Sequence, residues 1–187
     1  MRTKMSEDIL VKYCSPTLAG IKTANMFSCF FADEDEMRDS LRHWNHLLGT
    51  KGLRILPLTL KDKRALVYVY RISHLLRDMK DAAVRRLLKE RGYQTELPEH
   101  CIVRLMRRLQ ENGEFPHEIG LFLGYPPEDV CGFIENGAQG AKLTGYWKVY
   151  GNEEKARRIF ANYKKCTEVY TKKLASGSSV DKLTVAD

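Results

Sequence analysis

The middle of the chain carries the stretch that decides the fold around it, FPHEIGLFLGYPPEDV at residues 115–130. A helix-turn-helix needs a small residue where its two helices touch, a glycine in the turn, and an apolar residue about six positions later that packs back. Gly120, Gly124 and Val130 meet these needs in that order. The stretch therefore predicts a helix-turn-helix-like corner at residues 117–136.

This corner does not carry the side chains of a DNA-reading helix. A recognition helix presents Arg, Lys, Asn or Gln to base edges and phosphates. The exposed positions here include Glu128 and Glu135, whose carboxylates would be repelled by DNA phosphates. We therefore do not expect sequence-specific DNA binding through the corner.

His117-Glu118 matches the first half of the zinc-protease signature H-E-x-x-H. The second histidine would stand where the chain has Leu121, and the five cysteines form no C-x-x-C pair. A zinc site built from close ligand pairs is therefore not favoured, and we expect no metal site. For His117 the simpler alternative is that it caps or bridges the start of a helix.

Outward from the corner, the clearest β-structure is a hairpin. Residues 53–60 and 64–70 are two β-rich runs joined by the charged turn 61–63. Residues 20–31 are ambiguous between strand and helix, and their Thr, Phe and Cys content favours a strand. The hairpin and this strand predict a small, mostly antiparallel sheet.

Helical periodicity predicts most of the remaining elements. After Asp33, apolar residues at positions 37, 41, 44 and 48 fall on one helix face, with Glu36 as a capping partner. Further helices are predicted at 7–13, ending before Ser15-Pro16, at 72–91, from Pro98 and from Asn152. The result is an α+β fold in which the sheet packs with six or seven helices.

Length and composition bound the organisation of the chain. Its 187 residues suit a single α+β domain at 1–174, followed by a disordered tail at 175–187. No apolar run approaches the roughly 18 residues of a membrane span, and the polar start does not resemble a signal peptide. Five cysteines, an odd number, do not suit a secreted disulfide framework. We expect a cytoplasmic protein that does not contact a membrane.

Two other segments supply side chains suited to a binding site. Residues 15–22 (SPTLAGIK) contain hydroxyls, a glycine and a lysine, which suit an anion-binding turn but also an ordinary capped turn. Residues 145–150 (GYWKVY) alternate like a short strand and place Lys148 between two tyrosines on one face. That lysine suits contact with an anionic or aromatic ligand, or alternatively it is the solvated lysine of an edge strand.

Together these segments suggest a domain that binds a small anionic or phosphorylated ligand, with or without catalysis. The site requires that residues 17–22, 117–118 and 146–150 meet in space. In it Lys22 and Lys148 would neutralise charge, Thr17 would donate a hydrogen bond, His117 and Glu118 would form an acid/base pair, and Tyr125 and Trp147 would wall the pocket. No pattern identifies a cofactor, a substrate or a reaction class.

A non-catalytic interaction protein is the alternative hypothesis. The formal net charge is +7, and basic residues gather at 71–91 and 155–173. Two basic helices there would attract an acidic protein or bind nucleic acid without sequence preference. Because carboxylates are interspersed among the basic residues, two ordinary solvated helix faces would produce the same pattern.

Three motifs resemble a known bacterial family, the domain of unknown function 3793. They are CSPTLAGIK at 14–22, FPHEIGLFLGYP at 115–126 and GYWKVYG at 145–151, and the resemblance covers nearly the full length. It implies a cytoplasmic protein of anaerobic Firmicutes, without an activity or catalytic residues to carry over. It also implies a neighbourhood of flavodoxin genes, but this chain has no cysteine cluster and no Rossmann glycine pattern. An acidic flavodoxin therefore stays a candidate partner for the basic surface.

Overall fold

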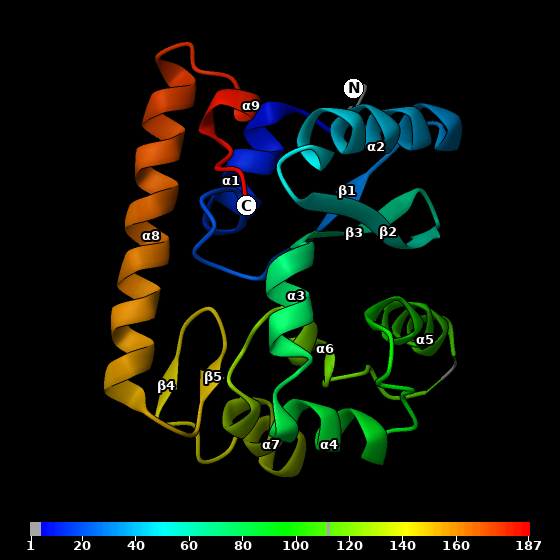
Figure 1. Cartoon of the computed structure of the whole chain (residues 1–187), viewed down its shortest axis with the longest axis vertical. Coiled ribbons are helices and arrows are strands. Elements are labelled where there is room, and N and C mark those ends of the chain that lie inside the picture. Colours follow the sequence, from blue (N-terminus) through cyan, green and yellow to red (C-terminus); the bar gives the residue numbers. More distant parts are fainter. Residues whose placement is uncertain (1–4, 112) are drawn as a thin grey trace. The chain divides into compact units, whose positions relative to one another are not determined.

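The computed structural model describes residues 5–111 and 113–187 (Figure 1). In this part of the chain, nine helices and two antiparallel sheets form an α+β fold, as the sequence predicts. The chain divides into two compact units. The first combines the residues up to His74 with Lys165–Asp187, and the second is Leu75–Lys164. The expected single domain at 1–174 stays a prediction.

The first unit is built on a three-stranded antiparallel sheet in the order β1-β3-β2. Its strands are β1 (Ala24–Phe30), β2 (Leu53–Lys61) and β3 (Arg64–Arg71). In the turn between β2 and β3, Asp62 and Lys63 have positive φ angles of 51° and 58°. Positive φ at both central residues is typical of the tight turn whose twist matches a hairpin. The predicted hairpin is confirmed.

Helix α2 (Glu34–Gly49) packs against β2 and runs along the sheet (Figure 1). The Asp33 carboxylate accepts a hydrogen bond of 2.9 Å from the Glu36 N–H, so the predicted N-cap is confirmed. The predicted apolar face is also buried, and it consists of Met37, Leu41, Trp44 and Leu48. This face contributes to a core shared by the sheet, α1 and α9.

Helix α1 (Glu7–Leu18) is longer than the sequence indicates, because it continues through Pro16. The proline removes one backbone donor, which normally ends or kinks a helix. Here the last turn is held by other bonds: the Ser15 hydroxyl donates to the Val11 carbonyl, and the Pro16 carbonyl accepts from the Ile21 N–H at 3.0 Å. The buried side chains from Cys14 to Leu18 favour continuation against the sheet.

Residues 175–187, expected from the sequence to be a disordered tail, contain helix α9 (Val180–Leu183) and return to the core of the first unit. Val180 and Leu183 are buried there. The Arg71 side chain, only 1% exposed, donates to the Leu18 and Val185 carbonyls at 2.8 and 2.6 Å. Arg71 also forms an ion pair with Asp187. A buried guanidinium therefore fixes the segment to the end of α1.

The predicted helix at 72–91 is two helices, α3 (Ile72–Asp78) and α4 (Ala82–Glu90). Asp81 separates them, because its side chain accepts hydrogen bonds from the Ala83 and Val84 N–H groups and caps α4. The apolar spacing is continuous across the break, so periodicity alone does not reveal it. α5 (Pro98–Gln110) begins at the predicted proline.

The remaining elements are the two helices of the predicted corner and the elements after it. They are α6 (Ile119–Phe122), α7 (Pro127–Asn136), the short strands β4 (Leu143–Thr144) and β5 (Lys148–Val149), and α8 (Glu153–Ala175). At the corner, a Cβ on Gly120 would lie 2.8 Å from Val130, and Gly124 has a φ of 75°. Both glycines are thus needed where the sequence pattern placed them, and the corner is confirmed.

Candidate functional site

A cavity of about 270 Å³ lies in the second unit, where the corner meets the β4–β5 hairpin. Helix α7 and strand β5 pack together there (Figure 1). The lining is mainly apolar and aromatic, and comprises His117, Ile119, Gly120, Tyr125, Asp129, Val130, Phe133, Trp147 and Lys148. Four of the predicted site residues, His117, Tyr125, Trp147 and Lys148, therefore share one cavity.

Two pairs of rings line this cavity. Tyr125 and Trp147 are stacked, with centroids 4.9 Å apart and an interplanar angle of 29°. His117 meets Phe133 edge-to-face, with centroids 4.8 Å apart and an angle of 82°. Both are favourable aromatic geometries. They hold the rings in fixed orientations and give the cavity flat walls.

Asp129 fixes the hairpin to the corner. This carboxylate is 3% exposed and accepts hydrogen bonds from the Trp147 indole N–H at 2.7 Å and from the Tyr150 and Gly151 backbone N–H groups at 2.8 Å each. It lies in the first turn of α7, where the helix dipole favours a negative charge. Asp129 therefore positions the Trp147 side chain in the cavity wall. It is the only carboxylate among the described residues that line this cavity.

No role is assigned to Asp129 from the sequence alone. Two signals point to it. A buried tryptophan needs an acceptor for its indole N–H, and an aspartate in the first helical turn is a favoured acceptor for backbone donors. The hydrogen bond between the two residues is long-range, because Trp147 follows Asp129 by 18 positions.

The hairpin is shorter than the predicted strand. Residues 145–147 form the turn between two-residue strands, in which Thr144 pairs with Lys148 and Leu143 with Val149. Trp147 and Val149 are buried, whereas Tyr146 is exposed. Lys148 is half-buried and lines the cavity, so the lining includes a lysine beside its aromatic residues.

The Tyr125 hydroxyl joins the corner to the hairpin turn. It donates to the Tyr146 carbonyl at 3.2 Å. Burial raises the pKa of Tyr125 to about 12, so this phenol is neutral at physiological pH. Tyr125 can therefore serve as a wall and a hydrogen-bonding group without carrying charge.

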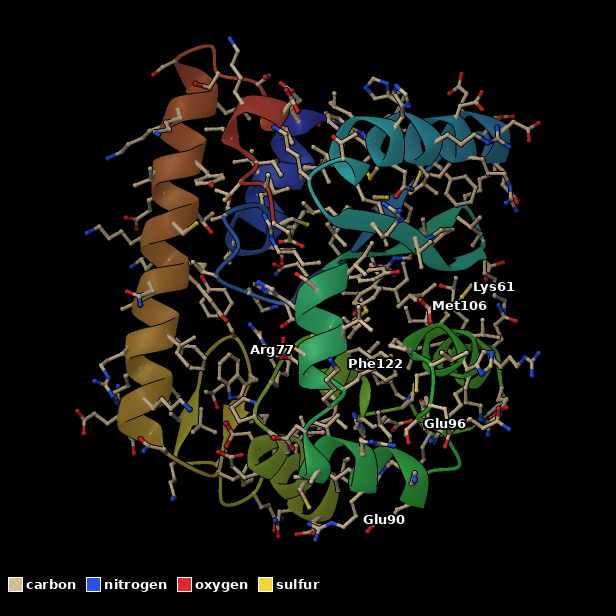
Figure 2. The ribbon with its side chains drawn as sticks, in the orientation of Figure 1. Lys61, Arg77, Glu90, Glu96, Met106 and Phe122 are labelled. Carbon is tan, nitrogen blue, oxygen red and sulfur yellow. The ribbon has the colours of Figure 1, made fainter. Side chains whose placement is uncertain are left out.

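Glu118 is turned toward α5. Its carboxylate is almost fully buried, accepts a hydrogen bond of 2.7 Å from the Tyr93 hydroxyl, and lies 2.6 Å from the Arg108 guanidinium. Burial, followed by the hydrogen bond to Glu118, raises the pKa of Tyr93. The ring of Phe122, the last residue of α6 and labelled in Figure 2, lies 5.8 Å from the Tyr93 ring between centroids. The contacts of Glu118 thus support a structural role, and an acid/base pair with His117 stays a prediction.

Thr17 and Lys22 belong to the first unit. The Thr17 hydroxyl donates to the Asn25 side-chain oxygen at 2.7 Å, and the Lys22 ammonium donates to the Ala24 carbonyl. Lys22 is 4% exposed, and burial lowers its pKa to about 7. Both side chains therefore take part in the packing of the first unit, and their meeting with the His117 segment stays a prediction.

Comparisons with known proteins and two further findings bear on the site. Among the described residues, no group of three His, Cys, Asp or Glu side chains could hold a metal ion. In the described residues, every helix is too short or too polar to span a membrane.

No curated protein and no solved structure matches the chain. One family model matches residues 10–184, nearly the full length, and the chain therefore belongs to the family described as protein of unknown function (DUF3793).

Proposed function

We propose that the second unit binds a small ligand with a flat apolar body and an acidic group. The observation that carries the proposal is the cavity of about 270 Å³ with its two ring walls and its lysine. Small-molecule pockets have volumes from about 300 Å³ upward and combine an apolar lining with a few placed polar groups. The cavity is close to that lower limit, so the ligand has about one or two rings.

The flat body is supported by the orientation of the rings. Stacking of Tyr125 on Trp147 leaves an aromatic surface along the cavity, and His117 lines it together with Phe133. A planar ligand gains both apolar burial and ring contacts against such walls. A flexible aliphatic ligand would gain only the burial and would lose more conformational entropy.

The acidic group is supported by the charges of the lining. Lys148 contributes a positive charge, and the negative charge of Asp129 is offset by three hydrogen-bond donors. A cationic ligand would meet the Lys148 ammonium and would have to compete for a carboxylate that already holds the hairpin. The acid is therefore the better match, and a quaternary ammonium compound is the contrasting probe.

His117 is the group in the cavity suited to proton transfer. Its imidazole lines the cavity and packs on Phe133. A histidine at a ligand can donate or accept a proton near neutral pH. Catalysis would therefore centre on His117, and simple binding would use the same imidazole as a hydrogen-bonding group.

We also place this function in a bacterial cytoplasm. The five cysteines are unpaired, and three of them, Cys14, Cys29 and Cys101, are buried. Buried free thiols suit a reducing compartment, where they act as small apolar core residues.

The proposal is tested by isothermal titration with benzoate, 1-naphthoate, benzamide and tetramethylammonium. We expect the two acids to bind, and Lys148→Met to weaken them about tenfold while benzamide is unaffected. Lys155→Met, which removes an exposed lysine from α8, is the matched control for net charge. Binding of tetramethylammonium but of neither acid, or an equal loss in both variants, would overturn the proposal.

A second candidate function is supported by α8, whose Lys164, Lys165, Lys172 and Lys173 are all exposed. Such a surface would bind an acidic protein, for example a flavodoxin, or nucleic acid. That function predicts an affinity that falls steeply between about 50 and 200 mM salt. It also predicts that Lys164→Gln/Lys165→Gln weakens binding while Lys148→Met does not.

A further inference from the structure

We infer that a second cavity in the second unit binds the phosphate group of a small phosphate monoester. It has a volume of about 330 Å³ and is lined by Gly92, Gln94, His100, Val103, Arg104 and Arg107. It shares no lining residue with the cavity walled by Tyr125 and Trp147, which we call the aromatic cavity. The two sites can therefore be tested independently.

Two arginines and a histidine of this cavity come from one face of α5. His100, Arg104 and Arg107 are separated by four and three residues, so they lie above one another on successive turns. Each guanidinium carries five N–H donors in a planar fork that matches phosphate oxygens. The lining contains no acidic side chain. Its charge therefore favours an anion with several acceptor oxygens.

The arginines are only partly occupied. Arg104 pairs with Glu111 through Nη1 at 2.9 Å, and both side chains of that pair are more than one-third exposed. Exposed pairs of this kind are weak, so a phosphate can compete for the guanidinium. Arg107 has no ion pair within residues 5–111 and 113–187. The cavity thus offers one lightly held and one available guanidinium.

The backbone around the cavity is held in place by bonds outside it. Tyr93 and Arg108, neighbours of lining residues, both bond the buried Glu118 carboxylate. The Cys101 thiol donates to the Gln94 carbonyl at 3.2 Å and ties the α4–α5 connection to α5. Such supporting contacts pre-organise a site and lower the entropy lost on binding.

The neighbours of the cavity restrict the ligand to a small ester. Val103, which is 46% exposed, provides an apolar contact for the organic part. The carboxylates of Glu90 and Glu96, labelled in Figure 2, lie at the end of α4 and in the α4–α5 connection, and Glu99 lies in the first turn of α5. These exposed acids would repel a long polyanion. A single dianionic group between the arginines is the better match.

The inference is tested by a ¹H–¹⁵N NMR titration with phenyl phosphate at about pH 7.5, where a phosphate monoester is mainly dianionic. We expect saturable shifts at residues 92–94 and 100–107, and at least a tenfold loss of affinity in Arg104→Gln/Arg107→Gln. Benzyl alcohol, which lacks the phosphate, should cause no shifts there. Inorganic phosphate should shift the same residues more weakly, because it makes no contact with Val103.

The matched control is Arg85→Gln/Arg86→Gln, which removes the same charge from exposed positions on α4. It should keep the wild-type affinity, and thermal unfolding checks that both double variants are folded. Equal losses in the two variants would mean attraction to net charge alone and would overturn the inference. So would shifts that map to the aromatic cavity instead of to α5, a result that would leave the proposed function of that cavity intact.

Discussion

Both units bury charged side chains, but they use them differently. In the first unit, the Arg71 guanidinium bonds the end of α1 and the C-terminal segment, and Lys22 is buried among core residues. In the second unit, Asp129 and Glu118 hold their segments together beside cavities. The first arrangement closes a core, whereas the second keeps rigid walls around a space. Buried charge alone therefore does not identify a binding site.

The largest effect should come from Arg71→Ala in the first unit. Removing this side chain leaves the Val185 carbonyl without its donor and takes one of two donors from the Leu18 carbonyl and from the Asp187 carboxylate. Breaking a buried pair of this kind costs about 3–5 kcal/mol. Urea unfolding should show this loss, and a loss below about 1 kcal/mol would mean that the C-terminal segment is not held by Arg71.

The corresponding change in the second unit is Asp129→Asn, which should cost about 2–3 kcal/mol. The amide oxygen can still accept from the Tyr150 and Gly151 N–H groups, but the amide N–H₂ would face the Trp147 indole N–H. Two donors would then meet in a buried place. The double variant Asp129→Asn/Trp147→Phe removes this conflict, so its loss should be smaller than the sum of the two single losses. Strictly additive losses would contradict the role given to Asp129.

The first unit should make the free energy of unfolding depend on pH, because its Lys22 is buried. The pKa of this lysine is about 7, against an ordinary value of 10.5. Between these values the unfolded chain binds more protons than the folded chain, so the free energy of unfolding rises with pH. Above pH 9 the buried Cys14 thiol acts in the opposite direction, since burial raises its pKa and only the unfolded chain releases the proton.

The measurement is therefore made between pH 7 and 9, by urea unfolding of the wild type and of Lys22→Met. The difference in the free energy of unfolding should change by up to about 1.4 kcal/mol per pH unit, with the wild type gaining relative to the variant. Parallel pH profiles would show that Lys22 keeps its ordinary pKa in the folded protein.

The smallest effect should come from the turn of the corner. Gly124 has a φ of 75°, a conformation that costs a residue with a Cβ about 1 kcal/mol. Gly124→Ala should therefore lower stability by about that amount in a thermal unfolding experiment. A neutral or stabilising result would mean that the turn between α6 and α7 is free to change conformation.

Local signals explain what the sequence could predict of the fold. The hairpin, the capped helix α2 and the corner all depend on residues within a few positions of one another, such as Asp33 with Glu36. The errors have a different origin. The continuation of α1 through Pro16 and the ordering of the C-terminal segment depend on tertiary partners, including Arg71. Such contacts leave no periodic pattern in the sequence.

The candidate site also has a part that the sequence could predict and a part that it could not. His117, Tyr125, Trp147 and Lys148 could be grouped from the sequence because a corner and a hairpin close in the chain supply them. The role of Asp129 could not, because it depends on a hydrogen bond to a residue in the next supersecondary element. Periodicity finds the faces of elements, but it does not show which polar groups become partners.

Binding of a planar acid in the cavity beside Trp147 is tested by following the indole N–H signal of Trp147 during a titration with 1-naphthoate. The chain has two tryptophans, and Trp44 lies in the first unit, where its indole bonds the Met5 carbonyl. Trp44→Phe assigns the two signals. We predict that naphthoate shifts the Trp147 signal saturably and leaves the Trp44 signal in place, and that Lys148→Met lowers the affinity about tenfold. A Trp147 signal that does not move, in protein that remains folded, would contradict this prediction.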